Sequence, residues 1–320
     1  MSESEPLVAV VVPVYNGAEF LRECLDSVLR QTYRNWQLII VDNSSTDGSR
    51  EIAAEFAGRD ERVQLVACDT FLSQVENWNR TQDLIPADAV YAKWLCADDW
   101  LFPECLTRMV EVGERYPSTV LISAYRVDDR QVNLDGLPVD VEFVPGRELG
   151  RAALLGELEY IFGSSSSVLV RHGPVQRTPF WDPDIPYFDL EMFYETLRHG
   201  DFGFVHQVLT YTRRHEGAIS AHRGSARLTA DQIRTLLAHG DYFLSPAEYE
   251  RRIAVKLVLH TKQLLLEAPT EWAAEPHRGM RSRLDWGVVA RGLRQQLGRT
   301  LRREHTPRWE PTDHPVRSGH

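Results

Sequence analysis

Apolar and polar residues alternate along the first half of the chain in a pattern that predicts strands and helices in turn. Short uninterrupted apolar runs predict buried strands, and apolar residues recurring at i, i+3, i+4 and i+7 predict helices. Strands that alternate with helices at this spacing indicate βαβ units, so we expect an α/β fold with a mostly parallel sheet. The predicted strands are residues 8–12, 36–41, 63–67, 89–95 and 120–125, with predicted helices between them.

The pattern changes after residue 125. Residues 127–144 alternate loosely around 133–136, which predicts a hairpin. Short strands are expected at 168–171, 202–205 and 208–212, and a helix at 190–199 follows a loop rich in proline. From residue 225 the chain is helical in character. We therefore predict an α/β domain at 1–222, a helical extension at 223–303 and a disordered tail at 304–320.

Composition narrows the possible functions. The chain has 320 residues and a net charge of −10, which disfavours nucleic-acid binding because phosphate binders carry basic surfaces. Its four cysteines lack C-x-x-C spacing, as expected of reduced residues in a cytoplasmic protein. The apolar run at 7–12 is too short for a signal peptide, and no run approaches the ~20 residues that span a bilayer.

Two of the predicted strands end in carboxylates. Asp42 follows the second strand, and the adjacent acids Asp98 and Asp99 follow the strand at 89–95. Ligands of open α/β sheets bind at this edge, and neighbouring like charges repel unless a cation or a donor-rich ligand lies between them. Two simpler interpretations stay open: Asp42 caps the following helix, and the adjacent acids are merely solvated.

Three motifs occur in order along this region, namely Val10-Val-Val-Pro-Val-Tyr-Asn-Gly17, Val41-Asp-Asn-Ser-Ser-Thr-Asp-Gly48 and Ala97-Asp-Asp99. With these motifs the chain resembles the family 2 glycosyltransferases of the GT-A fold, from residue 7 to about residue 220. The last hundred residues lie outside the resemblance. Three motifs in the family's order and spacing are far more specific than any one of them.

The resemblance implies a site for a nucleotide-sugar donor. Asp42 matches the family aspartate that accepts the N3–H of uracil. Asp99 matches a direct ligand of Mn²⁺ or Mg²⁺, and Asp98 matches an acid nearer the ribose. UDP is therefore the favoured nucleotide, although thymine presents the same N3–H. Pro13, Tyr15 and Asn16 match the loop that flanks the nucleotide base.

Two positions depart from the family pattern. Asn43 replaces a frequent second acid after Asp42, and Cys96 replaces the first acid of the Asp-x-Asp form. The tandem Asp-Asp form also occurs in the family, so metal binding is still expected.

A transferase of this kind also needs a base, because an acceptor hydroxyl is a poor nucleophile at neutral pH. Asp189 matches the family's base position at a predicted helix start. Its simpler interpretation is an N-cap, and Glu191 and Asp182 are rivals for the role.

A basic loop follows the last predicted strand. Arginine and hydroxyl donors suit a leaving diphosphate, and the family often carries a histidine-containing loop here. The resemblance implies that Arg214 and Ser220 bind the diphosphate and that His215 reaches the metal or a phosphate oxygen. The alternative is a solvated loop whose charge Glu216 balances.

The sequence therefore predicts a metal-dependent, inverting glycosyltransferase that moves a hexosyl or N-acetylhexosaminyl group from a UDP-sugar to an acceptor hydroxyl. The product class is a polysaccharide, a glycolipid or a natural-product glycoside. A non-catalytic nucleotide-sugar-binding relative is the alternative. A sugar nucleotidyltransferase is disfavoured, because the loop after the first strand has one glycine and no cation to cradle a triphosphate.

The C-terminal region carries an arginine-rich amphipathic pattern. Residues 278–303 hold eight arginines and one acid, with an apolar stripe from Trp286 to Leu301. Such a helix packs on its own protein or on a partner subunit, or lies on an anionic membrane. We expect packing on the protein, with self-association or peripheral membrane contact as further possibilities.

Overall fold

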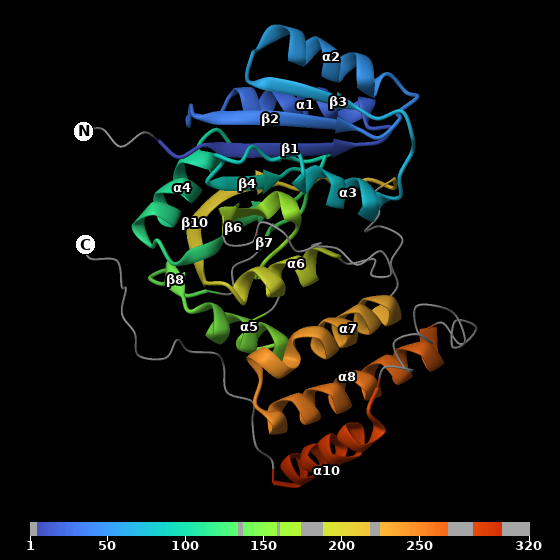
Figure 1. Cartoon of the computed structure of the whole chain (residues 1–320). Helices are drawn as coiled ribbons and strands as arrows, with labels where there is room; N and C mark the ends of the chain where they lie inside the picture. The colour runs from blue at the N-terminus through green and yellow to red at the C-terminus, as the bar shows by residue number, and fades with distance from the viewer. Residues whose placement is uncertain are drawn as a thin grey trace.

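The computed structural model describes residues 5–133, 137–158, 161–173, 188–217, 225–267 and 284–302. One mixed sheet of ten strands runs through the molecule, in the order β3-β2-β1-β4-β9-β6-β10-β5, with β7 beside β6 and β8 beside β10 (Figure 1). The strands are β1 (Val8–Val14), β2 (Trp36–Asp42), β3 (Val63–Ala67), β4 (Tyr91–Trp94), β5 (Trp100–Leu101), β6 (Thr119–Val127), β7 (Val132–Asn133), β8 (Phe143–Val144), β9 (Val168–Arg171) and β10 (Asp201–Tyr211).

The first four strands of the sheet are parallel, as the sequence predicts. β1 pairs with β2 on one side and with β4 on the other, and β2 pairs with β3. All seven residues of β1 are buried, which explains its uninterrupted apolar run. The carboxyl ends of β1, β2 and β4 consequently meet at one edge, where the sequence places its carboxylates.

Helices cover both faces of the sheet, and alternate residues of β1 face the two cores. Val8, Val10 and Val12 pack with α1 (Ala18–Leu29), α2 (Ser49–Arg59) and α4 (Cys105–Arg115). Ala9 and Val11 belong to the opposite core, with α3 (Gln74–Gln82), α5 (Gly146–Leu155) and α6 (Phe188–Leu197). The α/β prediction is therefore confirmed.

One local prediction was wrong, and another is tested only in part. The strands expected at 202–205 and 208–212 form one strand, β10, whose register with β6 shifts between Val205 and Val208. The expected turn at 133–136 lies partly outside the described residues, and the antiparallel partners β6 and β7 are instead joined at residues 128–131. Asp128 shapes that turn by accepting hydrogen bonds from the amides of Arg130 and Gln131 at 2.9 and 3.0 Å.

The C-terminal helices stack in sequence away from the sheet. α7 (Ser225–Phe243) packs on α5 and α6, α8 (Pro246–Glu267) packs on α7, and α10 (Trp286–Arg302) packs on α8 (Figure 1). Gly292 permits close contact in the last pair, since a Cβ there would lie 1.9 Å from the carbonyl oxygen of Glu250. Val289 is buried in this contact.

The predicted packing of α10 on its own chain is thus what the structure shows. Contact with a membrane or with a second copy through these helices stays a prediction. Among the described helices, none combines the length and the apolar character needed to cross a bilayer. The predicted tail at 304–320 lies outside the described residues.

Candidate active site

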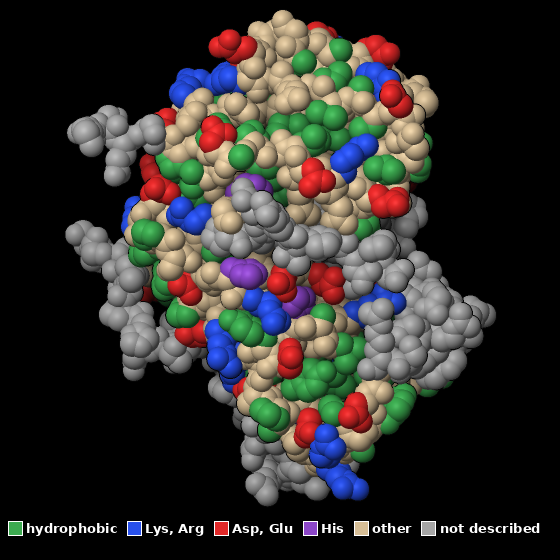
Figure 2. Space-filling model, in the orientation of Figure 1, with side chains coloured by type: hydrophobic (Ala, Val, Ile, Leu, Met, Phe, Trp, Pro, Cys, Tyr) green, Lys and Arg blue, Asp and Glu red, His purple; other side chains and the backbone are tan. Residues whose placement is uncertain are grey.

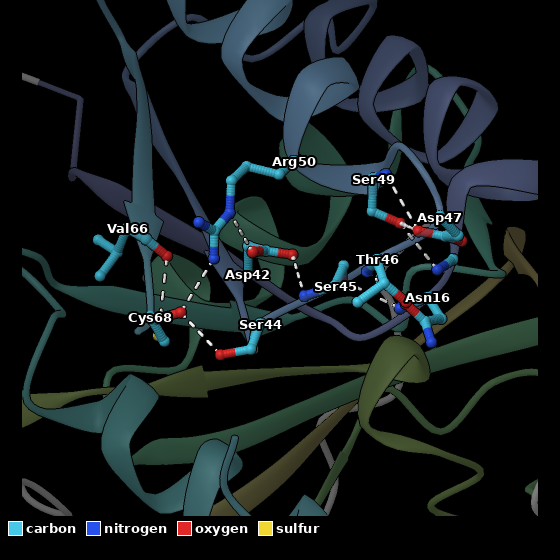
Figure 3. Close-up of polar contacts among 11 residues, drawn as sticks. Asn16, Asp42, Ser44, Ser45, Thr46, Asp47, Ser49, Arg50, Val66 and Cys68 are labelled. Atoms are coloured by element: carbon cyan, nitrogen blue, oxygen red, sulfur yellow. Dashed lines mark hydrogen bonds and ion pairs between the residues drawn. The ribbon is translucent and has the colours of Figure 1, made fainter. Parts of the chain in front are cut away.

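The loops that follow β1 and β2 interlock at the carboxyl edge of the sheet (Figure 3). Asn16 has a left-handed φ of 49°, and its backbone N–H donates to Ser45 Oγ at 3.0 Å. Its side-chain Oδ1 accepts from the backbone N–H of Thr46 at 2.8 Å. Asp47 accepts from the amides of Ala18 and Ser49 at 2.9 and 3.1 Å. These bonds fix the start of α1 against the start of α2.

Asp42 lies at the end of β2 and is fully buried. Its Oδ2 accepts from Arg50 Nε at 2.8 Å, its Oδ1 accepts from Ser45 N at 3.3 Å, and Arg50 also donates to the carbonyl of Cys68 (Figure 3). The N-cap of α2 is Gly48, and the amide that Asp42 accepts from belongs to Ser45, before the helix, so the simpler interpretation of Asp42 as a helix cap does not hold. The Asp42 carboxylate is instead held by a guanidinium and a backbone amide.

Two exposed aromatic rings pack together on the segments that follow β1 and β3, the two strands that flank β2. Tyr15 and Phe71 are 52% and 56% exposed, and their ring centroids are 4.7 Å apart. Pro13, by contrast, lies inside β1 opposite Val41. Sequence reasoning missed Phe71, although an apolar aromatic in the polar stretch between β3 and α3 was a usable signal.

The acidic end of β4 forms a compact cluster. One ligand-type atom from each of Cys96, Asp98 and Asp99 lies within 4.8 Å of the others. Asp99 is 3% exposed, and its burial, together with the charge of Asp98, raises its pKa to about 7. Burial likewise raises the pKa of the Cys96 thiol. A nearby positive charge would stabilise the ionised form of such a buried carboxyl.

The loop after β10 closes over this cluster. His215 Nε2 lies 3.0 Å from Asp98 Oδ2, and the amide of Arg213 donates to Asp99 Oδ1 at 3.0 Å. The two carboxylates and the imidazole thus form a set of oxygen and nitrogen donors that fits a hard divalent cation.

The loop contains two further predicted site residues, Arg214 and Ser220. Arg214 Nε donates to the buried carboxylate of Asp128 at 2.6 Å. Burial opposes ionisation of Asp128, but hydrogen bonds from the turn amides and from Arg214 outweigh it and lower its pKa to about 2. Ser220, like the rival base Asp182, lies outside the described residues.

The candidate base lies at the start of α6. Asp189 is half-buried, and its Oδ1 accepts from Ser165 Oγ at 2.8 Å. Ser165 belongs to η1 (Ser165–Ser167), a 3₁₀ turn that leads into β9. The neighbouring Ser166 accepts from Cys96 N at 3.1 Å, and its hydroxyl lowers the pKa of the Asp99 carboxyl.

Arg126 of β6 is a further site residue that sequence reasoning missed. Burial lowers the pKa of its guanidinium, and the charges of Asp99, Asp128 and Asp189 oppose this effect. Its buried Nε has no hydrogen-bond partner in the described part of the chain. Arg126 therefore adds a positive charge that interacts with Asp99 and with the candidate base Asp189.

Residues 9–170 match the family described as Glycosyl transferase family 2, which is just over half of the chain. The chain belongs to glycosyl transferase family 2. The matched region contains Asp42, Asp98 and Asp99, together with Arg126 and Ser165.

Known relatives of this family 2 glycosyltransferase include the glycosyltransferase GlyA of Streptococcus pneumoniae. The two sequences are 31% identical over 119 residues, which is 37% of this chain and 16% of GlyA. The chain therefore corresponds to only part of that relative.

Solved structures share the GT-A fold at low sequence identity. Residues 1–349 of S. aureus TarS, in complex with UDP-GlcNAc, are 14% identical, with a TM-score of 0.59 over 86% of this chain and 78% of that TarS chain. The mannosyltransferase PcManGT of Pyrobaculum calidifontis, in complex with GDP-Man and Mn²⁺, gives a TM-score of 0.54 at 14% identity, over 92% of this chain and 87% of its own.

Proposed function

We propose that this family 2 glycosyltransferase transfers a hexosyl or N-acetylhexosaminyl group from a nucleoside-diphosphate sugar to an acceptor hydroxyl, with inversion and with a divalent cation. The observation that carries the proposal is the meeting of three groups at one sheet edge. These are the acidic cluster closed by His215, the buried Asp42 and the candidate base Asp189.

The nucleotide is proposed to bind where the first two loops interlock. Tyr15 and Phe71 offer an exposed aromatic surface for a base to stack on. The Asp42 carboxylate would accept the N3–H of uracil, which favours a UDP-sugar. TarS binds UDP-GlcNAc and PcManGT binds GDP-Man, so UDP and GDP are the two nucleotides to compare first.

The cation, Mn²⁺ or Mg²⁺, is proposed to be held by Asp99 and His215, with Asp98 beside them. Asp98 and His215 are the more exposed groups, at 32% and 27% of their side chains. When bound, the cation would neutralise the charge that develops on the leaving diphosphate. Burial destabilises the ionised carboxylate of Asp99, and a bound cation would offset this desolvation penalty.

Asp189 is the proposed general base. Its carboxylate would take the proton from the acceptor hydroxyl as the sugar is transferred, and Ser165 orients it for this role. Attack from the side opposite the leaving diphosphate gives inversion. The charge of Arg126, which interacts with Asp99 and Asp189, would stabilise a diphosphate or an anionic acceptor.

Donor hydrolysis tests the proposal without knowledge of the acceptor. Nucleotide release is measured from UDP-, dTDP- and GDP-sugars, with Mn²⁺ and with EDTA. We expect Mn²⁺-dependent release of UDP. Binding of UDP without release from any donor would favour the non-catalytic alternative, and undiminished release in EDTA would exclude the cation site.

A further inference from the structure

A lysine is completely buried in β4, beneath the candidate active site. Lys93 is 0% exposed, and its Nζ donates to the carbonyl oxygens of Ser166 at 2.9 Å and Val168 at 3.1 Å. Met109 Sδ lies 3.9 Å from the same nitrogen. An ammonium buried in this way carries a large desolvation penalty, so an apolar residue would serve simple packing better.

The two carbonyls that Lys93 contacts lie in η1, at Ser166, and at the first residue of β9, Val168, and η1 contacts both the candidate base and the acidic cluster. Ser165 donates to the carboxylate of Asp189 at 2.8 Å. The adjacent Ser166 accepts from the backbone N–H of Cys96, a member of the acidic cluster, and its hydroxyl lowers the pKa of the Asp99 carboxyl. Two consecutive hydroxyls therefore connect the proposed base to the proposed cation site.

The position of η1 therefore affects both the candidate base and the proposed cation site. Ser165 and Ser166 are neighbours in η1, so a displacement of the turn moves both hydroxyls together. Lys93 bonds the turn at Ser166 and again two residues later at Val168. Without these bonds, two buried carbonyls would lose their donor and the turn would relax to satisfy them.

We propose that Lys93 is a positioning residue, which fixes the turn Ser165–Ser167 and thereby sets the spacing between Asp189 and the acidic cluster. The proposal rests on the proposed function, in which Asp189 is the base and the cluster holds the cation. It assigns a role to a residue that touches neither substrate nor cation.

The proposal predicts a pattern of effects across four single variants. Ser165→Ala lowers kcat and leaves the Kd of Mn²⁺ in the presence of UDP unchanged. Ser166→Ala raises that Kd. Lys93→Met lowers kcat and raises that Kd, each by about tenfold or more, as is found for groups that orient the ligands of a metal. Thr235→Ala is the control, because Thr235 is a buried hydroxyl that donates to the carbonyl of Asp231 within α7, away from the turn.

A double-mutant cycle separates positioning from general destabilisation. If Lys93 acts through the turn, Lys93→Met with Ser165→Ala lowers kcat no further than Lys93→Met alone. Lys256→Met is the control lysine, since Lys256 donates to Gln232 Oε1 at 2.6 Å in the helical extension. It is expected to lower Tm and to leave kcat and Kd unchanged.

The proposal is overturned if Lys93→Met lowers Tm while kcat and the Mn²⁺ Kd stay within twofold of the wild type. The proposal is also overturned if the double variant Lys93→Met with Ser165→Ala loses kcat by the product of the two single losses. If Lys93→Met does not fold, Lys93→Gln, which keeps one donor, takes its place in the cycle. Failure of the proposed function is seen separately: Asp189→Asn would then keep wild-type turnover, or Mn²⁺ would bind without dependence on Asp99.

Discussion

His215 Nε2 lies 3.0 Å from Asp98 Oδ2, although the two residues are 117 positions apart in the chain. Asp98 follows β4 and His215 follows β10. The imidazole also packs on Phe20 of α1, with ring centroids 4.9 Å apart. The loop after the last long strand is thereby held over the acidic end of a strand near the centre of the sheet.

This contact predicts that His215→Ala weakens UDP binding mainly when Mn²⁺ is present. The imidazole would ligate the cation or orient its ligand Asp98, so we expect a loss of about tenfold or more in Mn²⁺-dependent affinity. Calorimetric titration of UDP with Mn²⁺ and with EDTA measures it. His199→Ala is the control, since His199 is a surface residue near Glu195. Unchanged UDP affinity and turnover would remove the loop from the active site.

Asp189→Asn is expected to retain binding of UDP and Mn²⁺ but to lose transfer. An amide keeps the size of the side chain and cannot take a proton, and general bases contribute roughly 10²- to 10⁴-fold to rate. Binding and turnover are measured on the same preparation, with Glu191→Gln as the control for the rival carboxylate. Equal losses of affinity and turnover in Asp189→Asn would indicate a structural role instead.

The raised pKa of Asp99 predicts a pH dependence of stability in EDTA. Burial and the charge of Asp98 raise this pKa from 3.8 to about 7, so in that window the folded state binds a proton that the unfolded state has released. The free energy of unfolding therefore falls as pH rises from about 4 to 7, by roughly a few kcal/mol at most.

Urea unfolding of the wild type and of Asp99→Asn at pH 5 and pH 8 measures this effect. The wild type should lose stability relative to the variant at pH 8, and Mn²⁺ should restore stability to the wild type alone. Parallel pH profiles of the two proteins would show that Asp99 does not titrate in this range.

Gly292→Ala is expected to destabilise the contact between α10 and α8. The new methyl would lie 1.9 Å from the carbonyl oxygen of Glu250, so the helices must separate at a cost of about 1–3 kcal/mol. Thermal unfolding measures the loss. Gly287→Ala is the matched control on the same helix, where the nearest atom is an exposed side-chain oxygen at 3.1 Å. A wild-type Tm for Gly292→Ala would contradict the packing of α10 on α8.

Local signals predicted most of the fold. The buried run of β1 and the alternation up to α4 depend on residues close together in sequence, so periodicity alone located them. The strand at 201–211 was less predictable. His206 and Gln207 interrupt its apolar pattern, yet His206 is accommodated by hydrogen bonds to Tyr125 and to the carbonyl of Val141, both distant in sequence.

The sequence by itself determined that Asp42, Asp98 and Asp99 stand at strand ends, because a carboxylate that follows a buried parallel strand must lie at the edge of its sheet. The tertiary structure alone decided which groups meet there. β9 inserts antiparallel between β4 and β6, and this brings Ser165 to Asp189, Ser166 to Cys96 and Lys93 to the carbonyl of Ser166. The parallel pairing of β10 with β6 brings Arg214 to Asp128. Such pairings depend on the order of strands in the sheet, which no local pattern of side chains encodes.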